Sequence, residues 1–223
     1  MRVDWFGPAL AAHVPRLAEA YGIDRTLRAK DRIAVTFDDG PHPEGTPAVL
    51  DELARRGARA TFFLVGEQVV SRPALARRIA EDGHELGVHG YRHTLLLRRA
   101  MRALATDLDR AIGVIEDASG SSPTLYRPPY GVFTSSALAH VRERGWRPLL
   151  WSRWGRDWER WATPVSIARR ASARLRPGDV VLLHDSDAYS SADSWRKTTA
   201  ALPLLLDAVA ALGVSASCVT HST

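Results

Sequence analysis

The sequence predicts an α/β protein, a distorted and incomplete (β/α) barrel with about seven parallel strands. Short β-branched runs alternate with helical stretches along the chain, which is typical of β/α units around a parallel sheet. About seven strand runs and six helical stretches fall short of the eight units that close a regular barrel. A chain of 223 residues, of which 45% are hydrophobic, is sufficient for one such domain and its core.

The expected strands are short apolar runs. In chain order they cover Arg32–Phe37, Ala60–Val65, Glu85–His89, Thr124–Arg127, Arg147–Trp151, Asp179–His184 and Ser215–Val219. The expected helices cover Thr46–Arg56, Pro73–Asp82, Arg102–Ala118, Ser135–Arg144, Pro164–Arg174 and Lys197–Leu212. Local signals support the helix ends, because Thr46 is a candidate N-cap, and Gly57, Gly83 and Gly145 follow three of the helices.

The stretch before the first strand, residues 1–30, is expected to form a helical extension to a domain of residues 31–223. Asp4, Pro8 and Arg16 interrupt its apolar residues, so its start resembles a short amphipathic helix more than a signal peptide. The sequence has no apolar run near the roughly 20 residues that span a membrane. We therefore expect a cytoplasmic protein, with export as the alternative if a leader has been removed. A monomer is expected as the default for such a barrel.

The chain is basic, with a net charge of +5 and a pI of about 9.9, and its only lysines are Lys30 and Lys197. A basic surface can attract nucleic acid or another anionic polymer. Here the arginines are scattered among acidic residues, and no nucleic-acid-binding motif is present. We therefore expect no nucleic-acid partner. The single cysteine, Cys218, excludes an intrachain disulfide.

Unusual polar residues stand at the ends of the expected strands. Asp38 and Asp39 follow the first strand, His89 ends the third, Arg127 the fourth and His184 the sixth. In β/α barrels the carboxyl ends of the strands form the face on which active sites are built. Residues chosen only for core packing would not gather at one end of the sheet, so the pattern predicts an active site there.

A metal site is one use for these residues. His89 and His93 stand at positions i and i+4, a spacing that can offer two imidazoles to one ion, although each can also be a separate structural histidine. Adjacent carboxylates such as Asp38 and Asp39 repel each other unless a cation is near. An Asx-type turn would explain one of them, whereas a metal site uses both, one as ligand and one as base.

The other strand-end residues have two possible roles each. His184 is either a buried structural histidine or a general acid. Arg127, paired with Asp38 or with Asp157, would keep that carboxylate ionised and oriented. Tyr130 follows two prolines that stiffen its loop, and its N–H can point at a developing oxyanion. Of the remaining histidines, His42 is expected to face solvent, and His13, His140 and His221 to be structural or exposed.

Five motifs occur in one order and carry a family resemblance. They are TFDDGP at 36–41, GHELGVHGYRH at 83–93, RPPYG at 127–131, the tryptophan-rich block at 151–158 and LLHD at 182–185. In these motifs the chain resembles a polysaccharide deacetylase of the nodulation-factor (chitooligosaccharide) deacetylase type, carbohydrate esterase family four. The resemblance implies metal-dependent hydrolysis of the N-acetyl group of an N-acetylated sugar in an oligosaccharide, polysaccharide or lipid-linked glycan.

The resemblance also implies the metal site and the base. One divalent ion, zinc or alternatively cobalt or nickel, would be held by Asp39, His89 and His93. Asp38 would be the general base that takes a proton from the attacking water, and Arg127 would orient Asp38.

The remaining implied roles concern the leaving group and the substrate. His184 would protonate the departing amine, and Asp157 would tune either Arg127 or His184. The Tyr130 N–H would stabilise the oxyanion, while Leu182 and Trp158 would line a small pocket for the acetyl methyl group.

Two positions depart from the family pattern. Gly90 stands where the family usually has Ser or Thr, whose hydroxyl braces the metal-binding loop. Trp154 stands where the family often has an Asp, which leaves the partner of Asp157 open. Trp154 is expected either to stack on a sugar or to pack on the barrel rim. The alternatives to a deacetylase are a related deformylase, a cyclic-amide hydrolase, or a carbohydrate-binding relative without turnover.

Overall fold

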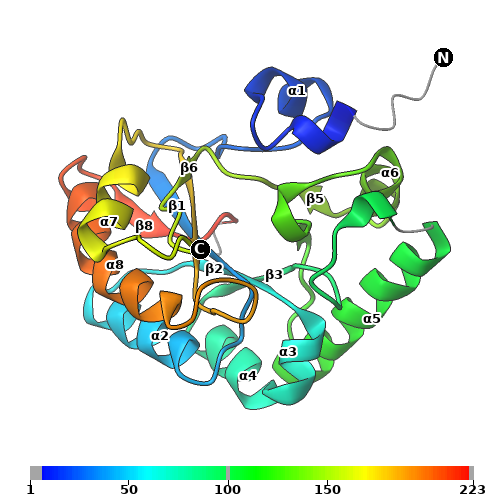
Figure 1. Cartoon of the computed structure of the whole chain (residues 1–223), viewed down its shortest axis with the longest axis horizontal. Coiled ribbons are helices and arrows are strands. Elements are labelled where there is room, and N and C mark those ends of the chain that lie inside the picture. Colours follow the sequence, from blue (N-terminus) through cyan, green and yellow to red (C-terminus); the bar gives the residue numbers. More distant parts are fainter. Residues whose placement is uncertain (1–6, 99–100, 221–223) are drawn as a thin grey trace.

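The structure, a computed structural model, describes residues 7–98 and 101–220. A single parallel sheet with the strand order β5-β4-β3-β2-β1-β7-β6 curls into an open half-barrel (Figure 1). The strands are β1 Arg32–Asp38, β2 Thr61–Leu64, β3 Glu85–Val88, β4 Leu125–Tyr126, β5 Arg147–Pro148, β6 Arg153–Trp154, β7 Val180–His184 and β8 Ser215–Ser217. The last of these pairs with the first half of β1. The predicted incomplete (β/α) barrel is therefore confirmed.

Helices cover the outer side of the sheet (Figure 1). They are α2 Gly45–Arg55, α3 Gly66–Ser71, α4 Pro73–Glu81, α5 Met101–Ser119, α6 Ser135–Glu143, α7 Pro164–Ser172 and α8 Ser194–Ala210, whereas α1 Pro15–Ala20 lies over the open side of the barrel. The short α3 was not expected, because six residues are too few to show a helical period. The central strand β1 is buried along all but its first residue, which explains its nearly unbroken apolar sequence.

The strand expected at Arg147–Trp151 is only partly present. Its first two residues form β5 beside β4, after which the chain crosses the open side of the barrel and begins β6 beside β7 at Arg153. The crossing residues Leu149, Leu150 and Trp151 are buried because they lie across the interior of the barrel. A short buried apolar run has the same sequence pattern whether or not it pairs as a strand, so the prediction was wrong there.

The N-terminal segment lies over the open side of the barrel, between β5 and β6 (Figure 1). Asp24 N–H donates to the carbonyl of Pro148, and Leu150 N–H donates to that of Asp24. On the other side of the opening, Leu27 N–H donates to the carbonyl of Gly178. Ile23 and Leu27 are each 3% exposed and belong to the main core. The segment therefore joins the two edges of the half-barrel.

The start of α2 differs from the expectation. The helix begins at Gly45, and the backbone N–H groups of Gly45 and Glu44 donate to Nδ1 of His42. Thr46 is already inside the helix, and its hydroxyl accepts from His42 N–H and donates to Asp185. The prediction of Thr46 as N-cap was therefore wrong, as was the prediction that His42 faces solvent. A histidine acceptor has no place in the usual list of capping residues.

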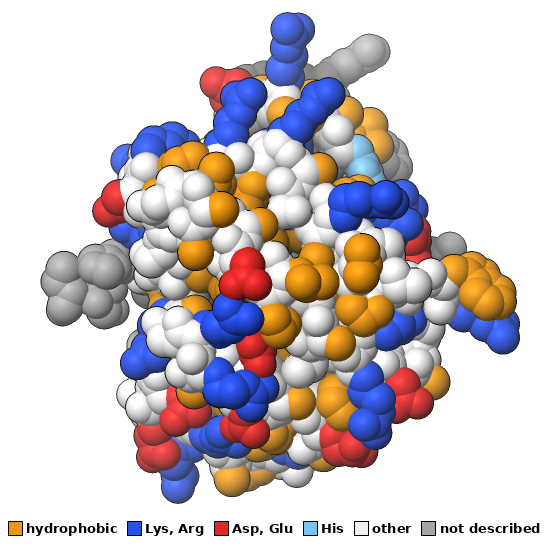
Figure 2. Space-filling view, turned by 90° about the vertical axis from the view of Figure 1, so that its left-hand side faces the viewer, with side chains coloured by type: hydrophobic (Ala, Val, Ile, Leu, Met, Phe, Trp, Pro, Cys, Tyr) orange, Lys and Arg blue, Asp and Glu red, His pale blue; other side chains and the backbone are white. Residues whose placement is uncertain are grey.

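The surface fits the scattered charge pattern of the sequence. Figure 2 shows basic side chains spread over one face of the molecule, with acidic side chains between many of them. Many of these arginines pair with acids, as Arg78 does with Asp51 and Asp82. Among the helices in the described ranges, none is long and apolar enough to cross a membrane.

Shortening the side chain of Ile23, which packs in the main core, tests whether the N-terminal segment belongs to the domain. Ile23→Ala should lower the free energy of unfolding by about 2 to 5 kcal/mol, because it removes a buried side chain and leaves a cavity. Leu10→Ala is the matched control, since Leu10 is 55% exposed, and it should change stability by roughly 0.5 kcal/mol or less. Urea unfolding measures both. Equal stability of the two variants would contradict a structural role for the segment.

Candidate active site

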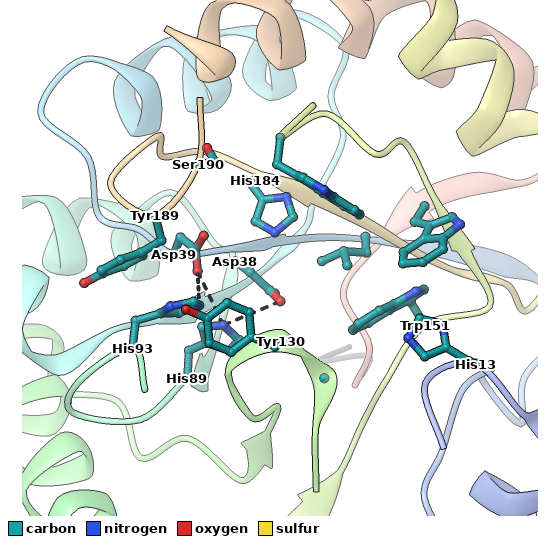
Figure 3. Close-up of a pocket in the computed structure, with 14 residues that line it drawn as sticks. His13, Asp38, Asp39, His89, His93, Tyr130, Trp151, His184, Tyr189 and Ser190 are labelled. Atoms are coloured by element: carbon teal, nitrogen blue, oxygen red, sulfur yellow. Dashed lines mark ion pairs between the residues drawn. The ribbon is translucent and has the colours of Figure 1, made fainter. Parts of the chain in front are cut away.

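A cavity of about 310 Å³ opens at the carboxyl ends of β1, β3, β4 and β7 (Figure 3). Its volume lies at the small end of the range for ligand pockets. Of the eleven predicted site residues, nine line it: Asp38, Asp39, His89, His93, Tyr130, Trp154, Trp158, Leu182 and His184. The other two, Arg127 and Asp157, are fully buried and each contacts a residue of the lining. The structure thus brings all eleven predicted residues to one place.

Three side chains form a compact group of possible metal ligands. The ligand atoms of Asp39, His89 and His93 all lie within 4.8 Å of one another. Oδ1 of Asp39 lies 3.4 Å from Nε2 of His89 and 3.2 Å from Nε2 of His93. Asp39 also has a φ of 79°, a strained backbone conformation for a residue other than glycine. Such strain is common at functional sites and here turns the carboxylate toward the histidines.

The protonation states of this group suit a cation. Burial lowers the pKa of His93 to about 4, so the imidazole is neutral at pH 7 and keeps a lone pair. Burial alone would raise the pKa of Asp39, but the adjacent imidazoles of His89, His184 and His93 outweigh it and lower the pKa. An ionised carboxylate beside the neutral imidazole of His93 belongs to a set of donors that Zn²⁺ accepts.

A backbone contact sets the tautomer of His89. Its Nδ1 lies 2.8 Å from the carbonyl oxygen of Arg127, which can only accept a hydrogen bond. Nδ1 is therefore the donor in this contact, and Nε2 is the ring nitrogen that faces Asp39 and is placed to bind a metal. Such a contact on the far nitrogen is the usual way in which a metal-binding histidine is oriented.

Arg127 lies in the middle of the barrel without any exposed surface. Its Nη1 donates to Oδ1 of Asp38 at 2.6 Å and to the hydroxyl of Thr36 at 2.9 Å. Its Nη2 donates to the carbonyl of Leu150, and the guanidinium lies 4.0 Å from the ring centre of Phe63. The contact with Asp38 settles one open alternative, because Asp157 is not the partner of Arg127.

Asp157 instead pairs with His184. Its two oxygens accept from the backbone N–H of His184 at 2.7 Å and face its Nδ1 at 2.9 Å, and Oδ2 also accepts from the hydroxyl of Thr198. Burial lowers the pKa of His184, but the charge and hydrogen bond of Asp157, with the charges of Asp39 and Asp38, outweigh it and raise the pKa to about 10. The imidazole is therefore protonated at neutral pH, with Nδ1 held by Asp157.

The loop between His89 and His93, which contains Gly90, is held by a hydrogen bond that replaces the missing hydroxyl. Gly90 has a φ of +90°, a conformation that disfavours any residue with a Cβ, and an added Cβ would lie 3.2 Å from the carbonyl oxygen of Arg92. Next to it, Tyr91 N–H donates to Oδ2 of the buried Asp107 at 2.8 Å. A carboxylate from α5 thus holds the loop where the family usually uses a hydroxyl. Asp107 could not be predicted as a site residue, because it lies in α5 with no motif around it.

The loop after β7 carries a further residue that sequence reasoning missed. The ring of Tyr189 stacks on that of His93, with centroids 4.2 Å apart and an interplanar angle of 12°. Its hydroxyl donates to Glu67 at 2.8 Å and accepts from Gln68 at 3.1 Å, both of which lie in α3. Tyr189 therefore fixes the ring plane of His93 by stacking on one of its faces.

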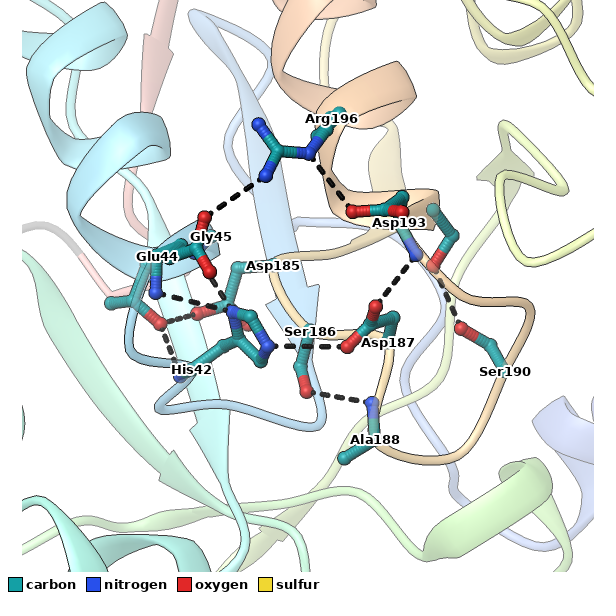
Figure 4. A network of polar contacts seen from close by, with 12 residues as sticks. His42, Glu44, Gly45, Asp185, Ser186, Asp187, Ala188, Ser190, Asp193 and Arg196 are labelled. Carbon is teal, nitrogen blue, oxygen red and sulfur yellow. Dashed lines mark hydrogen bonds and ion pairs between the residues drawn. The ribbon is translucent and has the colours of Figure 1, made fainter.

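This loop is fastened to the loop after β1 by a polar network (Figure 4). Nε2 of His42 lies 3.1 Å from Oδ1 of Asp187, and Arg196 contacts both Glu44 and Asp193. In the same network, the buried Asp185 accepts from Thr46, and burial raises its pKa to about 7. These contacts hold the two loops that flank the metal-ligand group in one arrangement.

Close approach explains why glycine stands at position 40. A Cβ at Gly40 would lie 2.4 Å from Oδ2 of Asp185, closer than any real contact. The first and fifth motifs therefore meet in space at this point, 145 residues apart along the chain. Gly40 and Pro41 are joined by a cis peptide bond.

Aromatic rings line the other side of the cavity. The ring centroids of Trp158 and His184 are 5.3 Å apart, those of Trp154 and Trp158 are 5.5 Å apart, and those of Trp151 and Trp154 are 5.7 Å apart. His13, from the N-terminal segment, lies 5.9 Å from Trp154 and also lines the cavity. His13 and Trp151 were not predicted as site residues, since His13 precedes every motif.

Comparison with known proteins agrees with these features. The model of the polysaccharide deacetylase family matches residues 26–149. The chain belongs to this family. It is 34% identical to a chitooligosaccharide deacetylase of Azorhizobium caulinodans, over 85% of this chain and 93% of the relative. It is 37% identical to a peptidoglycan-N-acetylglucosamine deacetylase of Bacillus cereus, over 69% of this chain and 72% of the relative.

A solved structure supports the assignment of the fold. The crystal structure of a peptidoglycan N-acetylglucosamine deacetylase superposes with a TM-score of 0.83 and 27% identity, over 90% of this chain and 92% of that one. The predictions of a polysaccharide deacetylase fold and of a carbohydrate N-deacetylase are thus confirmed. The individual roles of the site residues in this deacetylase stay predictions.

The pairing of Asp157 with His184 predicts an unusual titration. In the metal-free deacetylase, His184 should titrate near pH 10, and Asp157→Asn should move its pKa down by several units, because the burial remains while the charge is lost. The folded-state pKa is raised, so the stabilisation from this pair is complete below pH 6.5 and is lost as the pH rises through about 10.

NMR titration of the histidine ring protons measures this shift. Asp187→Asn is the control, since Asp187 pairs with His42 and should leave the titration of His184 where it is. A midpoint for His184 near 6.5 in the unaltered protein would contradict the assignment.

Proposed function

We propose that this deacetylase hydrolyses the acetamide of an N-acetylglucosamine unit, with Asp38 as general base and His184 as general acid. The observation that carries the proposal is the position of Asp38 beside the metal-ligand group. Oδ1 of Asp38 binds Arg127, while Oδ2 lies 3.9 Å from Nε2 of His89. The names of the relatives, which act on chitooligosaccharide and on peptidoglycan N-acetylglucosamine, support the choice of sugar.

We infer that Asp39, His89 and His93 hold one divalent ion, and that the ion is zinc. The residues fit such an ion, because Oδ1 of Asp39 is buried and accepts no hydrogen bond from the described residues, while His93 is neutral at pH 7. One oxygen and two nitrogen donors leave room for further ligands, as catalytic zinc sites do, and cobalt or nickel accepts the same donors. When bound, the ion supplies Lewis acidity, which makes water more acidic and polarises a carbonyl group.

The protein's own groups move the protons. Oδ2 of Asp38 takes a proton from the attacking water as the new C–O bond forms at the acetamide carbon. The C–N bond then breaks, and Nε2 of His184 donates a proton to the departing nitrogen, since Nδ1 is engaged with Asp157. One water is consumed, and acetate and a free amine are the products.

Two buried partners hold these residues for opposite tasks. Arg127 donates to Oδ1 of Asp38 at 2.6 Å, which orients the carboxylate and leaves Oδ2 for the water. Asp157 places a negative charge against His184, which favours the imidazolium form that an acid requires.

The remaining predicted residues would hold the substrate. Leu182 and Trp158 offer an apolar surface for the acetyl methyl group next to His184. Tyr130 lines the cavity, and its ring lies 4.6 Å from that of His93, so the residue lies beside the metal-ligand group. We propose that its N–H stabilises the oxyanion.

Acetate release is the direct test of this function. Protein stripped of metal should release no acetate from N-acetylglucosamine oligomers, and addition of zinc should restore release. Cobalt and nickel added in parallel identify the ion that supports turnover best. Metal binding without acetate release would contradict the proposal, and formylated and cyclic amide substrates in the same assay would then distinguish a deformylase or cyclic-amide hydrolase from a silent relative.

The different proposed roles of Asp38, as general base, and of His89, as metal ligand, predict that their variants lose activity in different ways. Asp38→Asn should keep the metal but lower kcat by about 10²- to 10⁴-fold, the usual effect of a lost general base. His89→Ala should lose both metal and turnover, because it removes a ligand. Mass spectrometry of bound metal together with acetate release measures the pair.

The stability of the variants must be compared as well. Asp38→Asn leaves the buried Arg127 facing a neutral amide, so both proteins are assayed at a temperature at which circular dichroism shows them folded. Equal metal loss in the two variants would refute the separate roles.

A further inference from the structure

His13 lies at the cavity although it comes from a part of the chain that the family match does not cover. That match begins at residue 26, whereas His13 lies between η1 (Gly7–Leu10) and α1. Its side chain is exposed, lines the cavity and meets the ring of Trp154 edge-on, at 5.9 Å between centroids and 61° between planes. An exposed ring at the mouth of a pocket is available to a ligand, which a ring buried in the core is not.

The backbone around His13 is held firmly. Ala11 and Ala12 on its N-terminal side are 0% and 5% exposed, and His13 N–H donates to the carbonyl of Leu10 at 3.0 Å. Ala12 packs near Gly131, where an added Cβ would lie 3.3 Å from Cβ of Ala12 and 2.5 Å from the ring of Trp151. The side chain of His13 is therefore presented from a fixed position and not from a loose terminus.

His13 lies at the far end of a row of rings that begins at the proposed acid. Trp158 contacts His184, Trp154 contacts Trp158, and His13 contacts Trp154, each with centroids 5.3 to 5.9 Å apart. Figure 3 shows the metal-ligand group on one side of the cavity and Trp151 and His13 on the other. A sugar whose acetamide reaches Asp38 and His184 thus occupies one end of the cavity and leaves the aromatic end to another part of the substrate.

We propose that His13 and the half-buried Trp154, packed on the buried Trp151, form a second sugar subsite that binds the unit next to the one being deacetylated. This inference rests on the proposed function. The C–H face of a sugar ring is apolar and its edge is polar, so a wall of aromatic rings suits it. The N-terminal segment, which seals the open side of the barrel, therefore also makes the enzyme prefer oligomers to the single sugar.

Kinetics on substrates of different length tests the subsite. His13→Ala should raise KM for the N-acetylglucosamine trimer by about 3- to 10-fold, the range expected for one lost aromatic contact, with little change in kcat. The rise in KM for the single sugar should be much smaller. His13→Phe keeps a ring and should restore the KM for the trimer to within about twofold. His140→Ala, on α6 and outside the cavity lining, is the matched control.

Binding to an inactive form separates this inference from the proposed function. Calorimetry of the trimer with Asp38→Asn and with the double variant Asp38→Asn/His13→Ala should show about the same loss of affinity as the rise in KM. An equal KM rise for trimer and single sugar, no rise for either, or failure of His13→Phe to restore binding would overturn the subsite. Absence of acetate release by the unaltered, metal-loaded enzyme would overturn the proposed function instead, and the calorimetry would still report on the subsite.

Discussion

The buried contact between Arg127 and Asp38 is the interaction on which the rest of the site depends. A guanidinium without exposed surface is tolerable only if its donors are used, and here they reach Asp38, Thr36 and the carbonyl of Leu150. One side chain thereby joins β4 to β1 and to the segment that crosses the open side of the barrel. Loss of one partner of such a pair typically costs about 3 to 5 kcal/mol. The carbonyl of Arg127 also sets the tautomer of His89, so fold and site share this residue.

The opening in the barrel determines which kinds of residue line each side of the cavity. On the side of the unbroken sheet, the ends of β1, β3 and β7 supply the acidic and histidine side chains. On the open side, the crossing segment, the end of β6 and the N-terminal segment supply aromatic rings instead. The cavity therefore has one polar and one aromatic side. This asymmetry suits a substrate that reacts at an amide and is held by its sugar rings.

Much of the site's order comes from contacts behind the lining. Tyr189 holds the ring of His93, Asp107 holds the loop between the two histidines, and Asp157 holds His184. The His42–Asp187 contact then fastens the loop of Tyr189 to the loop after β1. Partners of this kind orient the residues that touch a metal or substrate, and their loss weakens a site without removing any ligand.

The sequence by itself determined the β/α pattern, the gathering of Asp38, Asp39, His89 and His184 at strand ends, and the membership of one family of motifs. These features are local, since each depends on residue type and on spacing within a few residues. Only the tertiary structure decided that Asp157 pairs with His184 and that His13 reaches the cavity. It also decided that residues 149–152 cross the barrel without forming a strand of the sheet. Such contacts join segments far apart in the chain, and a local pattern contains no information about which distant side chain will complete a site.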